Sequence, residues 1–452
     1  MPLTKTSYSM IAGAPINVLD FGADNTGAVD STTAINDAIQ YAKTNSIQSV
    51  VFPYGEYTVS GKINVAGNFG NGILIEGNNC TITSTASTSI FYVNATLPEP
   101  APQYKINATI QNFNLVGKDK TVLGVIGVEM VDVACVSLMN VNIENCYRGL
   151  YGYGCLISDF IRVAAHDCYY GFQFLYNGNF APNDLNFSYC KLYGNTVAIN
   201  HLDFPNSSAT YIGCEIEGNN QSGNTTDAIR VTEFFNAGKV TLIGCHFEAN
   251  PGQYNLYYSS SGSGCGLSLI GCELVPGDSC GTVLKLSNVS GPTSLLVQES
   301  RVTNNVGTSQ ITVDSTCSAL IVGETAGYVT GTSVLRIING NIYTNDKLNV
   351  IVGGPGGQEL LVGNRTGNYE IEPGTTGTQS LGSAVKKWKS VFSTTVTPVA
   401  ITVANLAALS TLGIGTRATV TDANATTYGS VVAGGGANVV PVFYNGTNWI
   451  IA

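Results

Sequence analysis

Four of the five glutamates between residues 215 and 273, and the histidine among them, follow a cysteine by one or three positions. They are Glu215, Glu217, Glu248 and Glu273, together with His246. Hydrolysis of a glycosidic bond needs two carboxyl groups, one of which stays protonated to act as the acid. Like charges that lie close together raise one another's pKa, as such an acid requires. We therefore predict Glu217 and Glu248 as catalytic residues, with Glu215 as the alternative partner.

A short repeat spaces these residues along the chain. Its copies share an apolar–polar alternation around a small anchor residue, at Cys190, Cys214, Cys245, Cys272 and Ser300. The steps between anchors are 24, 31, 27 and 28 residues. Alternation is the period of a strand, and a closing Gly or Asn supplies a turn residue that tolerates positive φ. Strands that return once per coil stack about 4.8 Å apart. The sequence therefore predicts an all-β solenoid, a parallel β-helix.

The alternation also predicts which way each side chain points. Anchor cysteines and the apolar residues two positions later share the inward face, so we expect these cysteines to be reduced and buried. The intervening residues face outward in two columns: Lys191, Glu215, His246, Glu273 and Arg301, and beside them Tyr193, Glu217, Glu248, Val275 and Thr303. Glu217 and Glu248 on adjacent strands would lie about 5 Å apart at the backbone. The diagonal pair Glu215 and Glu248 would lie about 7 to 8 Å apart. The competing interpretation is an exposed polar surface on which Lys191, His246 and Arg301 neutralise the glutamates.

A second polar group lies mostly on the preceding coils. It combines the aspartates Asp159, Asp167, Asp184 and Asp203 with the tyrosines Tyr147, Tyr151, Tyr153, Tyr169, Tyr170, Tyr176 and Tyr193. Aromatic faces stack on sugar rings and carboxylates bind hydroxyls, so this mixture suits a saccharide groove. The predicted substrate-binding residues are His246, Glu273, Tyr193, Lys191, Asp184 and Asp203. The aspartates are the competing catalytic group, and wall packing or subunit contact is the competing role of the tyrosines. For the isolated His166 and His201 we expect structural roles.

Composition narrows the class of partner. The formal net charge of −10 argues against nucleic acid. No apolar run approaches the roughly 18 residues of a membrane span, so we expect no membrane insertion. Residues 1–6 lack the apolar core of a secretory signal. The cysteines lack the paired short spacing of a zinc site, so we expect neither a metal nor another cofactor.

Changes in composition divide the chain into four predicted parts. Residues 1–15 form an arm or attachment segment, 16–345 the parallel β-helix, 346–398 a linker or stem, and 399–452 a small C-terminal β-domain. Apolar residues at helical spacing from Ala34 to Ala42 follow Asp30 as a candidate N-cap. They predict a helix that caps the open end of the solenoid. Asn445-Gly446 between apolar runs predicts a hairpin.

The segment that contains this expected helix resembles a known family. Residues 16–59 include Asp20-Phe21-Gly22-Ala23, Asp30-Ser31-Thr32 and Val51-Phe52-Pro53. Together they resemble the N-terminal signature of the pectate-lyase-like superfamily, and especially of bacteriophage tailspikes; the coils extend the resemblance to about residue 340. Leu381-Gly382-Ser383, followed by Trp388, is similar to a segment near the ends of many phage tail proteins. The signature is shared by hydrolases, lyases and binding-only spikes, so it indicates a fold more than an activity.

This resemblance implies a right-handed parallel β-helix, assembled as a homotrimer on the virion. The N-terminal arm would attach to a tail or baseplate protein, and the solenoid would bind a bacterial surface polysaccharide. Our first interpretation is that it also cleaves this polysaccharide as an endo-glycosidase-type depolymerase. The alternative is a non-catalytic receptor-binding tailspike of the same fold. A third is a bacterial polysaccharide hydrolase or lyase, although the Asp-Asp and Gly-His-Gly motifs of polygalacturonases are absent from the sequence.

Overall fold

The described part of the chain comprises an N-terminal solenoid and a separate C-terminal sheet. The computed structural model describes residues 13–67, 69, 72–95, 105–178, 180–220, 230–260, 265–275, 280–288, 293–302, 311–313, 317–322, 329–330, 334–338, 400–408 and 413–452. The chain divides into two compact units, residues 1–361 and 362–452. Residues 1–12 of the predicted arm and the predicted stem 346–398 lie outside the described residues.

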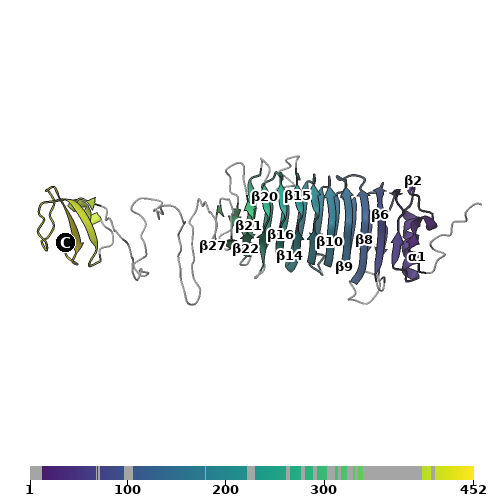
Figure 1. Cartoon of the computed structure of the whole chain (residues 1–452), viewed down its shortest axis with the longest axis horizontal. Coiled ribbons are helices and arrows are strands. Elements are labelled where there is room, and N and C mark those ends of the chain that lie inside the picture. The colour runs from purple at the N-terminus through teal and green to yellow at the C-terminus, as the bar shows by residue number, and fades with distance from the viewer. Residues whose placement is uncertain are drawn as a thin grey trace, which may run out of the picture. The chain divides into compact units, whose positions relative to one another are not determined.

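The first unit is a parallel β-helix, as the repeat predicts. All pairings among its 27 strands are parallel, and the strands stack side by side in successive coils (Figure 1). Each coil contributes to three ladders of paired strands, which we call the first, second and third in the order in which the chain runs through them.

The strands that belong to single ladders are short. The first ladder contains β1 (Ile16–Asn17), β3 (Ser49–Val51), β12 (Asn183–Ser188), β19 (Cys265–Ile270), β22 (Thr293–Gln298), β25 (Ser318–Val322) and β27 (Val334–Ile338). The second contains β2 (Thr26–Asp30), β4 (Glu56–Val59), β13 (Lys191–Tyr193), β15 (Glu215–Glu217), β17 (His246–Glu248), β20 (Glu273–Val275) and β23 (Arg301–Val302). The third contains β5 (Ile63–Ala66), β7 (Ser89–Asn94), β11 (Tyr170–Leu175), β18 (Tyr254–Ser260), β21 (Thr282–Asn288), β24 (Ile311–Val313) and β26 (Val329–Thr330).

Longer strands turn the corners and join two or three ladders. These are β6 (Ile73–Ser84), β8 (Lys105–Val116), β9 (Ile126–Glu144), β10 (Arg148–His166), β14 (Val197–Ile212) and β16 (Arg230–Ile243). Residues with positive φ mark many of the corners. A corner made by one left-handed residue lets a strand change direction without a loop.

The inward column of cysteines is confirmed. Cys190, Cys214, Cys245 and Cys272 are buried and carry free thiols. Each Sγ lies within hydrogen-bond distance of a backbone carbonyl one coil earlier; for Cys214 this is the Phe187 oxygen, at 3.5 Å. Burial and neighbouring thiols raise the pKa of Cys214 and Cys245 to about 12. These cysteines therefore act as small core residues rather than as nucleophiles.

A buried ladder of asparagines lines the corner between the second and third ladders. Asn195, Asn219 and Asn250 are each at most 1% exposed. The Asn195 backbone N–H and Nδ2 donate to Asn219 Oδ1, at 3.1 and 3.0 Å, and Asn219 donates likewise to Asn250. The closing Gly or Asn was expected to supply a residue that tolerates positive φ, and Gly194 (66°) and Gly218 (60°) do so. The asparagine that follows each of them turns its amide inward.

A helix lies at the N-terminal end of the solenoid, where its sequence predicts it (Figure 1). The 3-10 helix η2 spans Val18–Phe21, and α1 spans Thr32–Thr44 with Ile35, Ala38, Ile39 and Ala42 buried. The predicted N-cap Asp30 is wrong, since Ser31 occupies that position. Asp30 Oδ1 instead accepts bonds from the Thr32 hydroxyl at 2.7 Å and the Ser60 backbone N–H at 2.9 Å. None of the helices in the described residues has the length and apolarity to cross a membrane.

The second unit contains a four-stranded sheet. Its elements are β28 (Ala400–Ile401), η3 (Val403–Ala408), β29 (Arg417–Ala423), β30 (Asn438–Tyr444) and β31 (Trp449–Ile451). Antiparallel β30 and β31 form the hairpin predicted at Asn445-Gly446. Gly446 has a φ of 103°, a conformation that side-chain-bearing residues rarely adopt.

Candidate functional site

The second ladder brings the predicted glutamates together on its outer face. Its register pairs Lys191 with Glu215, Glu215 with His246, His246 with Glu273 and Glu273 with Arg301. The neighbouring column pairs Tyr193 with Glu217, Glu217 with Glu248 and Glu248 with Val275. Both columns therefore have the register that the repeat predicts; Thr303, the last member of the second column, lies outside the described residues.

Charges alternate along the first column. Lys191 Nζ lies 2.5 Å from Glu215 Oε2, and Arg301 Nη1 lies 2.9 Å from Glu273 Oε1. His246 Nε2 lies 3.6 Å from Glu248 Oε2 and 3.9 Å from Glu273 Oε2. These side chains are half-buried or exposed, so each pair contributes little to stability. The arrangement holds the carboxylates in fixed positions at the surface.

Two glutamates on one strand differ in their affinity for a proton. A hydrogen bond from the Lys191 ammonium lowers the pKa of the Glu215 carboxyl. A hydrogen bond with Glu215 raises the pKa of Glu217, and burial and the charge of Glu215 add to this effect. Glu217 therefore retains its proton to higher pH than Glu215. A pair of carboxyl groups whose pKa values are pushed apart is the arrangement that acid–base catalysis uses.

The outer column extends further than we had predicted. His166 pairs with Tyr193 in the register and with Glu144 on the preceding coil. The rings of His166 and Tyr193 stack at 4.6 Å with an interplanar angle of 7°. His166 Nε2 lies 3.4 Å from Glu144 Oε2, and its Nδ1 lies 3.0 Å from Asp167 Oδ2. Continuing the outward column upstream from Tyr193 would have found both His166 and Glu144. His201, by contrast, is fully buried.

Asp184 and Asp203 lie outside the two columns. Asp184 is on β12 and accepts a bond from the Ser208 hydroxyl at 2.6 Å; Asp203 is on β14 and accepts one from Asn236 Nδ2 at 3.0 Å. The other two aspartates also have separate partners, Asp159 with Asn186 and Asp167 with His166. The structure does not bring the four aspartates into one cluster. Of the predicted substrate-binding residues, those that flank the glutamates are His246, Glu273, Tyr193 and Lys191.

A match to a protein family covers the start of the solenoid. Residues 15–118 match the family described as rhamnogalacturonase A/epimerase, pectate lyase-like. A comparison with proteins of curated function finds no match.

Solved structures with a similar fold come from phages and bacteria. ORF18 of Geobacillus virus E2 is 16% identical with a TM-score of 0.43, over 75% of this chain and 62% of that one. Tailspike protein 3 of bacteriophage CBA120 is 15% identical with a TM-score of 0.46, over 79% of this chain and 64% of that one. PfbA, a surface adhesin of Streptococcus pneumoniae, is 11% identical with a TM-score of 0.47, over 78% and 97% of the two chains. This chain thus spans less than two thirds of the two phage proteins.

Proposed function

The chain carries a pectate lyase-like domain at residues 15–118, and we propose that it is a tailspike that binds and cleaves a bacterial surface polysaccharide. The polysaccharide lies along the outer face of the second ladder. The observation that carries the proposal is the register that places Glu217 beside Glu248 on adjacent coils, with Glu215 two residues away on the same strand. The raised pKa of Glu217 and the lowered pKa of Glu215 agree with it. In the virion the N-terminal arm attaches the spike to a tail or baseplate protein.

Cleavage is a hydrolysis in which two glutamates have different roles. Glu217 donates its proton to the leaving glycosidic oxygen as the bond to the anomeric carbon breaks. Glu248 acts on the opposite side of the sugar, either as the base that takes a proton from the water attacking this carbon, or as a nucleophile whose glycosyl ester is then hydrolysed by water. The hydrogen bond with Glu215 and its negative charge keep the Glu217 carboxyl protonated until it donates the proton. Tyr193, stacked on His166 and 42% exposed, offers an aromatic face to a sugar ring beside the acid.

The test is incubation of the full chain with purified bacterial surface polysaccharides. Release of reducing ends supports the proposal, and mass spectrometry of the products identifies the reaction. Products that carry one added water support hydrolysis, whereas unsaturated products lighter by one water would replace it with a lyase.

A binding spike without catalysis is the second candidate. It is favoured by the ion pairs that neutralise Glu215 and Glu273 through Lys191 and Arg301. Tight binding of a polysaccharide whose chain length does not change on prolonged incubation would establish this candidate instead.

The pH dependence of cleavage depends on the pair Glu215 and Glu217. Glu217 acts as the acid only while protonated, so the rate falls as the pH rises through its raised pKa. Glu215→Gln removes the negative charge that raises this pKa, so the alkaline limb of kcat should move to lower pH. Profiles of kcat from about pH 4 to 9 measure the shift. Glu56→Gln, at an exposed position of β4 in an early coil, is the control and should leave the alkaline limb in place. An alkaline limb that does not move in Glu215→Gln would contradict the role of Glu215.

We also propose that the ends of the solenoid are closed by other parts of the chain. Helix α1 caps the first coil with its buried face, and residues after 345 hold a homotrimer together. A chain that ends at residue 345 should be monomeric or aggregate in analytical ultracentrifugation, because its last coil has no cap. A stable trimer of this shorter chain with an unchanged melting temperature would disprove the role of the C-terminal part.

The role of helix α1 as the cap of the first coil has its own test. An Ile39→Asp variant that stays monodisperse and has an unchanged melting temperature would disprove this role.

A further inference from the structure

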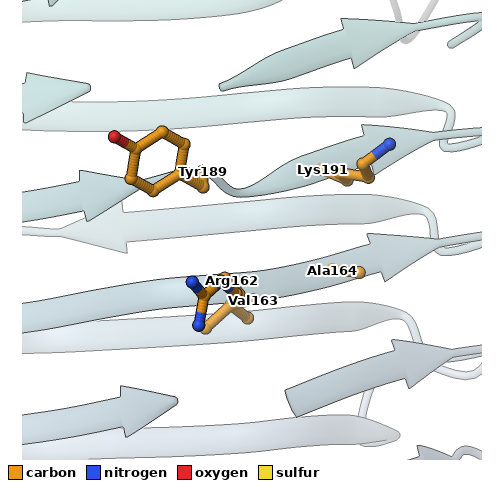
Figure 2. A pocket seen from close by; sticks show the side chains of 5 residues that line it. All are labelled: Arg162, Val163, Ala164, Tyr189 and Lys191. Atoms are coloured by element: carbon orange, nitrogen blue, oxygen red, sulfur yellow. The ribbon is translucent and has the colours of Figure 1, made fainter. Parts of the chain in front are cut away.

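A hollow of about 400 Å³ lies at the corner between the first and second ladders. Its lining consists of Arg162, Val163, Ala164, Tyr189 and Lys191, from β10, β13 and the turn before β13 (Figure 2). Its volume is within the range of small-molecule sites. Lys191 also binds Glu215, so the hollow adjoins the proposed catalytic residues.

Short side chains between long ones create this hollow. Val163 and Ala164 belong to β10, while Arg162 and Tyr189 project from the corner and Lys191 from β13 (Figure 2). The Tyr189 ring lies against Gly213 on the next coil, where an added Cβ would be 2.9 Å from the ring. Tyr189 is nevertheless 60% exposed. The hollow therefore combines an apolar floor with an accessible aromatic ring and two cationic side chains.

Arg162 and Tyr189 are unusually large side chains for this corner, because the backbone there has positive φ. One residue per coil has positive φ here: Asn112, Asn140, Arg162, Tyr189, Gly213, Gly244, Gly271 and Glu299. Asn and Gly adopt this conformation at the least cost, whereas larger side chains are strained in it. Arg162, Tyr189 and Glu299 have large side chains at this position. Arg162 (52°) and Tyr189 (56°) are on neighbouring coils, and both line the hollow. Strain that is retained at a cavity indicates that the side chains themselves are needed.

Arg162 also differs from other arginines of the solenoid. Arg148, Arg230 and Arg301 each donate to a glutamine or glutamate side chain. Among the described residues, the Arg162 guanidinium has no such partner. Lys191 has three N–H donors and uses one on Glu215. In a chain of net charge −10, this hollow therefore has two positively charged side chains close together, and such a local positive potential attracts anions.

We propose that this hollow binds a negatively charged sugar residue, a uronic acid, of the polysaccharide. The sugar ring stacks on Tyr189 over the partly exposed Ala164, and its carboxylate accepts hydrogen bonds from Arg162. Lys191 binds the neighbouring hydroxyls and positions the chain at Glu215. The inference rests on the proposed function, because it names the class of polysaccharide bound beside the glutamates.

The test uses the full chain on an array of bacterial surface oligosaccharides in which each uronic acid glycan is paired with its carboxyl-reduced form. The wild type should prefer the acidic form by about 10-fold or more, as expected for charge-assisted hydrogen bonds. Arg162→Asn should reduce this preference to within about 2-fold while the melting temperature stays equal or rises, because Asn suits positive φ. Tyr189→Asn should weaken binding of both forms. Arg417→Asn, a matched substitution in the C-terminal sheet, should change neither.

The outcomes separate this inference from the proposed function. Binding of neutral glycans alone, or equal binding of acidic and reduced forms by the wild type, would overturn the uronic acid site and leave the proposed function intact. Binding of acidic glycans by Arg162→Asn as tightly as by the wild type would also overturn it. A chain that binds no glycan on the array would overturn both.

Discussion

Replacing Glu217 by glutamine should lower the rate of polysaccharide cleavage by a factor of about 100 or more. The amide keeps the volume of the side chain and its ability to hydrogen-bond to Glu215, but it carries no proton that can be transferred to the leaving oxygen. Binding of the polysaccharide should be retained. Reducing-end release under saturating substrate, together with a separate binding measurement, distinguishes the two effects.

Glu248→Gln should cause a similar loss, since the second carboxylate is needed on the next coil. Glu56→Gln is the matched control: Glu56 is exposed on β4, in an early coil of the same ladder, so the rate of this variant should stay within a few-fold of the wild type. Full activity in both Glu217→Gln and Glu248→Gln would disprove the assignment. A selective loss in variants of Asp159, Asp167, Asp184 or Asp203 would place the chemistry on other strands.

The period of two in the sequence was sufficient to predict the ladder that carries the site. Inward Leu192, Ile216 and Phe247 alternate with outward glutamates, and a shift of one residue would bury those carboxylates. The register between coils followed from the anchor cysteines, because each copy of the repeat begins at the same corner. The predicted columns therefore agree with the observed pairing from Lys191 to Arg301.

Side-chain partners were harder to predict than register. We considered glutamates on neighbouring coils, but the carboxyl groups that perturb one another most are Glu215 and Glu217, two apart on one strand. The alternation of apolar and polar residues predicts the face of the strand from which a side chain projects. It does not predict the rotamer that brings two carboxyl groups together. His166 was expected to be isolated and structural; its place in the outer column beside Tyr193 was not predicted, because its coil has no anchor of the repeat type. The hollow at Arg162 was not predicted either, since bulky residues at a corner do not belong to the alternation of apolar and polar residues from which the repeat was predicted.

The asparagine ladder is the feature whose loss should destabilise the solenoid most. Asn219→Ala removes the oxygen that accepts from Asn195 and the amide that donates to the Leu192 carbonyl at 2.9 Å. Asn219 is 0% exposed, so the Asn195 backbone N–H loses its acceptor and the Leu192 carbonyl loses a donor in the interior. Each group left unsatisfied costs about 1 to 3 kcal/mol. We expect the free energy of unfolding to fall by about 2 to 5 kcal/mol, measured by denaturant titration with circular dichroism.

Asn186→Ala provides the control for this prediction, because Asn186 is exposed and bonds only Asp159 among the partners shown by the structure. Its effect should stay within about 0.5 kcal/mol. The double variant Asn195→Ala/Asn219→Ala should be less destabilised than the sum of its parts, since the two amides share one network. Equal stability of Asn219→Ala and Asn186→Ala would contradict a structural role of the ladder.

Because Asn219 Nδ2 also lies 3.2 Å from the Glu217 carbonyl oxygen, the ladder holds the strand that carries the proposed acid. Loss of Asn219 should therefore reduce cleavage even below the temperature at which the chain unfolds.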